Sequence, residues 1–226
     1  MKKPAVFFLL VIAPAFAICL ALLGLETLKS NILGWILLGL GIAFPAGGII
    51  YFFIRHEPFW KAASGGEAVR EEKGDRSFWL ILPGFLAAHF LPPIEWMALP
   101  AALPRILGMQ VAGLIIVVAG IGLLVWARAH IRGLYSGHVE VQSDHQLVQS
   151  GPYHFVRHPA YTGYLLFALG LSIGYASWLG LLSIPLLLIP GLAYRILVEE
   201  RLLSSWFGDE FKLYKGRTKK LIPGIW

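Results

Sequence analysis

The chain has 226 residues, of which 57% are hydrophobic and only 14% are charged, and its formal net charge is +6. These values exclude an ordinary soluble domain, whose core needs far fewer apolar residues, and indicate a chain that faces lipid. The single cysteine excludes an intrachain disulfide framework and a cysteine-based zinc site. Membrane topology and contact with anionic lipids explain the basic surplus, and we expect no nucleic-acid partner.

Apolar runs long enough to cross a hydrocarbon layer of roughly 30 Å predict five or six transmembrane helices. Four such runs fill the first part of the chain: residues 5–25, 32–54, 78–103 and 106–127. A further apolar stretch, residues 159–198, is broken near residues 174–178 and therefore predicts a helical hairpin. Together with the four runs, the hairpin brings the number of membrane crossings to six, or to five if the hairpin is partly re-entrant. The predicted fold class is an all-α, polytopic membrane helical bundle.

The first run follows Lys2 and Lys3, and it leaves open the alternative of a cleaved signal peptide. The run continues to Leu25, well beyond the small residue Ala17. Such a length favours a spanning helix over a short signal core.

The basic residues fall almost entirely on one side of the predicted bundle. If the N-terminus is cytosolic, 17 of the 19 lysines and arginines lie inside, and only Lys29 and Arg105 lie outside. The positive-inside rule then predicts that both termini are cytosolic. The expected location is the plasma (inner) membrane in a prokaryote and the endoplasmic reticulum in a eukaryote.

Two ionisable residues of the third run, His89 and Glu95, are candidates for a site because such residues are costly at membrane depth. Structural roles are favoured, since Glu95 lies near the outer interface and His89 has no partner in sequence. Four glycines inside apolar runs are predicted to be helix-packing positions rather than a dinucleotide loop. They are Gly39, Gly41, Gly120 and Gly122.

The densest set of polar, aromatic and basic side chains lies in residues 128–164, between the fourth run and the hairpin. Pro159 suits the first turn of a helix, where a missing N–H costs nothing. The free amides of that turn are expected to point at the loop and to favour an anionic ligand group.

A second polar cluster closes the hairpin, where Arg195 and Glu199 are four residues apart on one helical face. The simplest interpretation is a surface ion pair worth about 0.3–0.5 kcal/mol. The hairpin, however, returns the chain to the membrane face from which the loop departed, so the two clusters are expected to meet. Beyond them, apolar and charged residues alternate over residues 202–215 and predict an interfacial amphipathic helix.

Ordered motifs of residues 151–223 resemble those of the isoprenylcysteine carboxyl methyltransferase family of integral membrane enzymes. They are Gly151-Pro152-Tyr153, Arg157-His158-Pro159-x-Tyr161-x-Gly163, Arg195-x-x-x-Glu199-Glu200, Phe207-Gly208-x-Glu210-Phe211-x-x-Tyr214 and Leu221-Ile222-Pro223. The Arg-His-Pro-x-Tyr piece is also shared with phospholipid N-methyltransferases and, more loosely, with membrane sterol reductases. The first half of the chain has none of these motifs and contributes only its predicted transmembrane helices.

The resemblance implies S-adenosyl-L-methionine as the cofactor, with no metal. It implies the following cofactor contacts: His145, Gln146, Leu147, Val148, Tyr153, His158, Pro159, Ala160, Tyr161 and Glu199. Arg195 and Glu199 are the candidate catalytic residues, and Arg195 would face the acceptor carboxylate. A further glutamine contact of the family is approximated by His138 or Gln142.

The resemblance implies methyl transfer to a lipophilic, membrane-embedded acceptor, a carboxylate of the isoprenylcysteine type. A carboxylate is already ionised at pH 7, so the rate is expected to depend on how the enzyme positions the two reactants and not on a strong base. The alternatives are a phospholipid or small-molecule N- or S-methyltransferase, an NADPH-dependent membrane reductase and a scaffold without turnover. We expect one integrated membrane domain, with a four-helix region at 1–127 and the cofactor-binding and catalytic region at 128–226.

Overall fold

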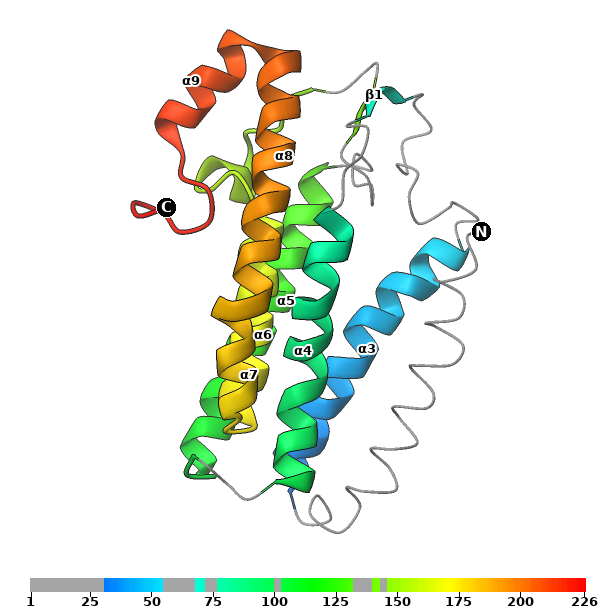
Figure 1. The fold of residues 1–226 in the computed structure, drawn as a ribbon, viewed down its shortest axis with the longest axis vertical. Coiled ribbons are helices and arrows are strands. Elements are labelled where there is room, and N and C mark those ends of the chain that lie inside the picture. Colours follow the sequence, from blue (N-terminus) through cyan, green and yellow to red (C-terminus); the bar gives the residue numbers. More distant parts are fainter. Residues whose placement is uncertain (1–30, 55–67, 72–76, 100–102, 132–139, 143–145) are drawn as a thin grey trace.

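A computed structural model describes residues 31–54, 68–71, 77–99, 103–131, 140–142 and 146–226 (Figure 1). Most of these residues form helices that run along the long axis of the molecule (Figure 1). The helical part of the predicted fold is therefore confirmed. The predictions for the first apolar run, residues 5–25, and for His145 and His138 concern residues outside the described part.

The helices account for the apolar runs within the described residues. They are α3 (Ile32–Ile54), α4 (Ser77–Ala98), α5 (Leu107–Ile131), α6 (Pro159–Gly174), α7 (Trp178–Ser183), α8 (Ile189–Phe207) and α9 (Asp209–Arg217). Three helical stretches in this part of the chain are long and apolar enough to cross a membrane: Trp79–Ala98, Leu107–Ile131 and Trp178–Phe207. These lengths are those of an integral membrane protein.

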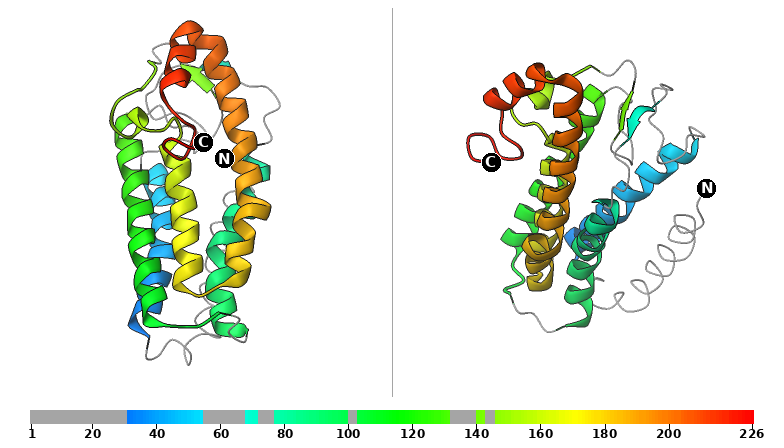
Figure 2. Two further views of the ribbon diagram at one scale, coloured as in Figure 1. Left: turned by 90° about the vertical axis from the view of Figure 1, so that its left-hand side faces the viewer. Right: turned by 45° about the horizontal axis from the view of Figure 1, so that its top comes forward.

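Two short strands correct the all-α prediction. Strand β1 (Ala68–Glu71) pairs antiparallel with β2 (Glu140–Gln142), and both lie at the end of the bundle that also carries α9 (Figures 1 and 2). They belong to the two long polar connections, which lie outside the apolar runs. Pairing satisfies backbone groups that no helix contains, and so short a pair leaves no hydropathy signal.

The predicted helical hairpin is confirmed, with its break at Tyr175, Ala176 and Ser177 between α6 and α7. The buried carboxylate of Glu95 in α4 accepts hydrogen bonds from the Ser177 hydroxyl (2.6 Å) and from the Leu179 N–H (2.8 Å). Glu95 therefore satisfies donors at the N-terminus of the last helical stretch, which is a structural role.

The last helical stretch contains two prolines, Pro185 and Pro190, and yet it continues from Trp178 to Phe207. A π-helical turn, η3 (Ile184–Leu188), interrupts it, and the N–H of Ile189 donates to the carbonyl of Ile184. A proline ring clashes with the carbonyl four residues earlier, and the wider turn relieves this conflict.

Glycines allow α5 and α6 to pack with their backbones in close contact. A Cβ atom added at Gly120 would lie 2.7 Å from the Phe167 nitrogen and 2.8 Å from the Gly163 carbonyl oxygen. Gly120 is thus a packing position, as predicted. Gly41 has a looser contact, with Leu171 at 3.9 Å from the added Cβ.

Gly39 and Gly122 have no such packing contact with the described residues. A Cβ atom added at either residue meets no atom of the described residues within 4 Å. Both glycines are two residues from a packing glycine, and a helix turns about 200° in that distance, so the pair cannot share one face.

The predicted interfacial helix over residues 202–215 is split in two. Helix α8 continues to Phe207, and Gly208, with φ of 54°, separates it from α9. The apolar side chains Phe211 and Tyr214 of α9 are buried against the protein rather than exposed as a lipid-facing stripe. The glycine provides the left-handed conformation that the sharp bend requires.

Candidate functional site

The two polar clusters meet at the end of the bundle that also carries α9, which confirms the proximity expected from the hairpin. The Tyr161 hydroxyl, in the first turn of α6, donates a hydrogen bond to the Glu199 carboxylate of α8. The Arg195 Nε donates to the same carboxylate at 2.8 Å. His158 precedes α6, and its Nδ1 lies 3.4 Å from the Glu199 Oε2. One carboxylate therefore joins groups from two helices.

The imidazole of His158 lies between two carboxylates, because its Nε2 is 3.4 Å from the Glu200 Oε1 on the side opposite Glu199. Its ring also stacks on Tyr161, with 5.6 Å between the ring centroids. Burial lowers the pKa of His158, but the hydrogen bonds and charges of Glu199 and Glu200 outweigh burial and raise the pKa above its ordinary value of 6.5. The protonated imidazolium is therefore favoured.

The stability of the ligand-free protein is expected to fall as pH rises above 6.5. The folded state binds the His158 proton more tightly than the unfolded state, so its contribution is complete below the unfolded pKa and is lost as pH rises through the folded pKa. Melting temperature measured against pH checks this, and His158→Gln is expected to flatten the slope. An unchanged slope in this variant would contradict the assignment, and His154→Gln, at an exposed histidine, is the control.

Arg195 is held by groups on two helices. Besides the bond to Glu199, its Nη1 donates to the Ser77 hydroxyl at 3.0 Å, and Ser77 is the fully buried first residue of α4. No sequence pattern indicates a role for Ser77, which lies 118 residues away in the chain. The guanidinium is therefore fixed in direction at the edge of the cluster.

The other predicted cofactor contacts fall into two groups. Tyr153, Ala160 and Val148 pack with Leu124 and Ala127 of α5 in one hydrophobic cluster. The remaining residues have separate positions: Pro159 is the first residue of α6, Gln146 is exposed, and Leu147 is half-buried in the preceding loop. Of the predicted cofactor contacts, His158, Tyr161 and Glu199 lie together, whereas Tyr153, Ala160 and Val148 pack against α5.

The C-terminal segment, residues 218–226, forms one side of this region, which sequence reasoning missed. The backbone N–H groups of Arg157 and His158 donate to the carbonyls of Lys219 (2.8 Å) and Lys220 (3.0 Å). The Arg157 Nε forms a 2.7 Å ion pair with Glu200, and its Nη1 donates to the Thr218 carbonyl. The segment is thereby tied to the loop that carries His158.

Helix α9 is tied to the same loop by Tyr214, whose hydroxyl donates to the Tyr153 carbonyl at 2.6 Å. Burial raises the pKa of Tyr214 to about 12, so the hydroxyl remains a donor at physiological pH. We expect Tyr214→Phe to lower the free energy of unfolding by about 1–3 kcal/mol, because the buried carbonyl loses its partner. Melting curves check this. Tyr194→Phe, at a tyrosine with 39% exposure, is the control, and equal effects of both changes would contradict the prediction.

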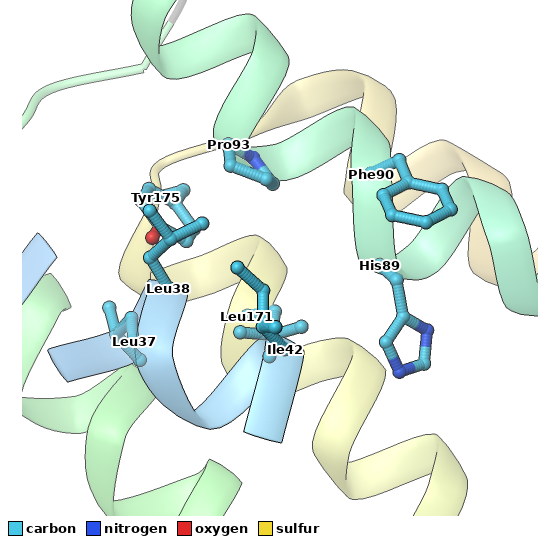
Figure 3. A pocket seen from close by; sticks show the side chains of 9 residues that line it. Leu37, Leu38, Ile42, His89, Phe90, Pro93, Leu171 and Tyr175 are labelled. Carbon is cyan, nitrogen blue, oxygen red and sulfur yellow. The ribbon is translucent and has the colours of Figure 1, made fainter. Parts of the chain in front are cut away.

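A separate pocket lies between α3, α4 and α6, away from this region (Figure 3). Its lining is apolar except for His89 and Tyr175. The His89 Nδ1 bonds to the Phe85 carbonyl at 2.7 Å, its ring packs on Phe85 and Phe167, and its buried Nε2 has no hydrogen-bond partner among the described residues. The contacts of His89 are therefore those of a side chain packed between α4 and α6.

Comparisons with known proteins agree with the motifs. Residues 109–210 match the family described as phospholipid methyltransferase. The chain is 38% identical over 82 residues to the protein-S-isoprenylcysteine O-methyltransferase of Schizosaccharomyces pombe. These residues are 36% of this chain and 35% of that protein. The Saccharomyces cerevisiae protein of the same name is 28% identical over 152 residues (62% of this chain, 64% of that protein).

The human protein-S-isoprenylcysteine O-methyltransferase is 32% identical over 126 residues, which are 54% of this chain and 44% of that protein. The matched parts thus span between 35% and 64% of these three relatives. The similarities confirm the resemblance that the motifs indicated.

Proposed function

We propose that this chain, as a relative of the protein-S-isoprenylcysteine O-methyltransferases, is an integral membrane enzyme that transfers a methyl group from S-adenosyl-L-methionine to a lipophilic carboxylate. One observation carries the proposal. The phenol of Tyr161, the imidazole of His158 and the guanidinium of Arg195 converge on the Glu199 carboxylate.

The chemistry of this cluster fits the proposed cofactor. Bound S-adenosyl-L-methionine supplies an electrophilic methyl group on a positively charged sulfonium. The Glu199 side chain is 21% exposed, whereas the side chains of its partners His158 and Arg195 are 6% and 9% exposed. The carboxylate is thus more accessible than His158 and Arg195, and it can compensate a cationic ligand or accept its hydrogen bonds. Tyr161 and His158 hold this carboxylate in place.

We assign Arg195 to the acceptor. Its guanidinium can orient a carboxylate through paired, charge-assisted hydrogen bonds, and its bonds to Glu199 and Ser77 restrict its direction. A carboxylate needs no deprotonation at pH 7, so the chain's contribution is to align the reacting groups. An acceptor with an apolar tail can reach the site from the bilayer without leaving hydrocarbon.

A second candidate acceptor is a phospholipid or small-molecule amine, which the match of residues 109–210 to the phospholipid methyltransferase family favours. An ammonium acceptor must lose a proton before attack, and Glu199 or Glu200 would have to help remove it. Activity on such an acceptor is expected to rise towards alkaline pH. The relatives give no support to the reductase or to the scaffold.

We further propose a multi-pass topology with five to six transmembrane helices and both termini in the cytosol. The basic residues of α8, α9 and the C-terminal segment support this orientation, since they gather at one end of the bundle. Residues 1–127 would supply the membrane scaffold, and residues 128–226 the chemistry, within one domain. The membrane is the inner membrane in a prokaryote and the endoplasmic reticulum in a eukaryote.

The test of this function uses the full chain reconstituted in lipid vesicles with radiolabelled S-adenosyl-L-methionine. With N-acetyl-farnesylcysteine as acceptor, we expect base-labile methyl incorporation, as a methyl ester gives. Transfer to a phosphatidylethanolamine amine without ester formation would reassign the acceptor. No transfer to either, together with no binding of S-adenosylhomocysteine, would overturn the proposal.

A further inference from the structure

An open groove that includes Glu200 lies between the second half of α8 and the last turns of α9. Its lining residues are Leu197, Glu200, Arg201, Ser204, Ser205 and Lys215. Apart from Leu197, every lining side chain is polar or charged. Helix α9 and the last turns of α8 lie at one end of the bundle (Figures 1 and 2).

The free charge in this groove is positive. The Glu200 carboxylate is already paired with Arg157 at 2.7 Å and lies 3.4 Å from the His158 imidazole. Arg201 is exposed and makes no ion pair or side-chain hydrogen bond with any described residue. Lys215 lies 3.9 Å from Glu200, a long contact for an ion pair. A guanidinium and an ammonium are thus both available to an anion.

Hydroxyl donors lie beside these charges. Ser204 and Ser205 are exposed, one helical turn beyond Arg201 on the same face of α8. The Ser205 hydroxyl donates to the Leu202 carbonyl at 2.8 Å, so Ser204 is the hydroxyl donor that the groove offers. The Arg201 guanidinium, the Lys215 ammonium and the Ser204 hydroxyl together provide the directed donors that a phosphate group prefers.

The same face of α8 becomes apolar towards the middle of the bundle. Leu197 is 45% exposed and Tyr194 is 39% exposed, four and seven residues before Arg201. This order of groups matches a ligand with an anionic head and an apolar tail lying along the helix. A free phosphate would use only the polar end.

We propose that this groove binds the phosphate headgroup of an anionic phospholipid, with Arg201 and Lys215 on the phosphate and Leu197 beside the acyl chains. The inference does not depend on the methyl acceptor, and it assigns a site separate from Glu199 and Arg195.

The test is the thermal stabilisation of purified full-length protein in detergent by phosphatidylglycerol, phosphatidylcholine or inorganic phosphate. We expect phosphatidylglycerol to raise the melting temperature and the other two probes to have little effect. Arg201→Gln is expected to raise the phosphatidylglycerol concentration for half-maximal stabilisation at least about tenfold, because it removes a charge-assisted contact. Lys212→Gln removes the same charge from an exposed position of α9 outside the groove, and it should leave that concentration unchanged.

Three results would overturn the proposal. Equal stabilisation by phosphatidylcholine would remove the need for an anionic head, and equal stabilisation by inorganic phosphate would remove the lipid. Equal losses in the Arg201 and Lys212 variants would indicate general attraction between charges. Native mass spectrometry of the retained lipid provides a second measurement, so a variant with a lower melting temperature still reports on binding.

Discussion

Replacing Glu199 with glutamine is expected to weaken the binding of S-adenosylhomocysteine by about a hundredfold and to abolish measurable methyl transfer. The carboxylate accepts hydrogen bonds from Tyr161 and Arg195 and lies 3.4 Å from the His158 imidazole. Removing its charge leaves His158 and Arg195 without a shared anionic partner and removes the anion that we propose faces the ligand. Equilibrium dialysis with radiolabelled ligand measures the change.

The control for this experiment is Glu210→Gln, which alters an exposed carboxylate hydrogen-bonded to Gln149. It is expected to bind S-adenosylhomocysteine as tightly as the unchanged protein. If Glu199→Gln lowers the melting temperature but leaves ligand binding intact, Glu199 has only a structural role. That result would remove it from the proposed cofactor site.

The second large effect is expected from Gly120→Ala in α5. The added Cβ would lie 2.7 Å from the backbone nitrogen of Phe167 and 2.8 Å from the Gly163 carbonyl oxygen, so α5 and α6 must move apart. We expect the free energy of unfolding to fall by about 1–3 kcal/mol, as for other overpacked sites. Unfolding of the purified protein by increasing sodium dodecyl sulfate, followed by circular dichroism, measures the change.

A matched control lies two residues away on the same helix. Gly122→Ala adds the same methyl group where no described atom lies within 4 Å of it. It gains helix propensity without a clash, so its stability should be unchanged or slightly higher. Equal destabilisation by both changes would show that backbone contact between α5 and α6 is not the cause.

Local patterns in the sequence were sufficient for most of the helices. The bounds of α3, the hairpin break near Ser177 and the position of Pro159 at the start of α6 follow from apolar run length and proline chemistry. Helix α5, by contrast, continues to Ile131, four residues beyond the apolar run. Hydropathy marks the edge of the hydrocarbon, whereas basic residues such as Arg128 can extend a helix beyond it.

Contacts between distant segments were not predictable in the same way. The bond between Arg195 and Ser77, the pairing of β1 with β2 and the bonds from the C-terminal segment to Arg157 join residues far apart in sequence. No period or spacing relates them. The meeting of Tyr161 with Glu199 was predictable because the hairpin fixes which ends of its two helices adjoin.

Ultraviolet cross-linking of radiolabelled S-adenosyl-L-methionine to the full chain, followed by mapping of the labelled peptides, tests the proposed site most directly. Label is expected in peptides that contain residues 146–161 or 195–200, and excess S-adenosylhomocysteine should suppress it. Suppressible label confined to other peptides, such as that carrying His89, would contradict the account.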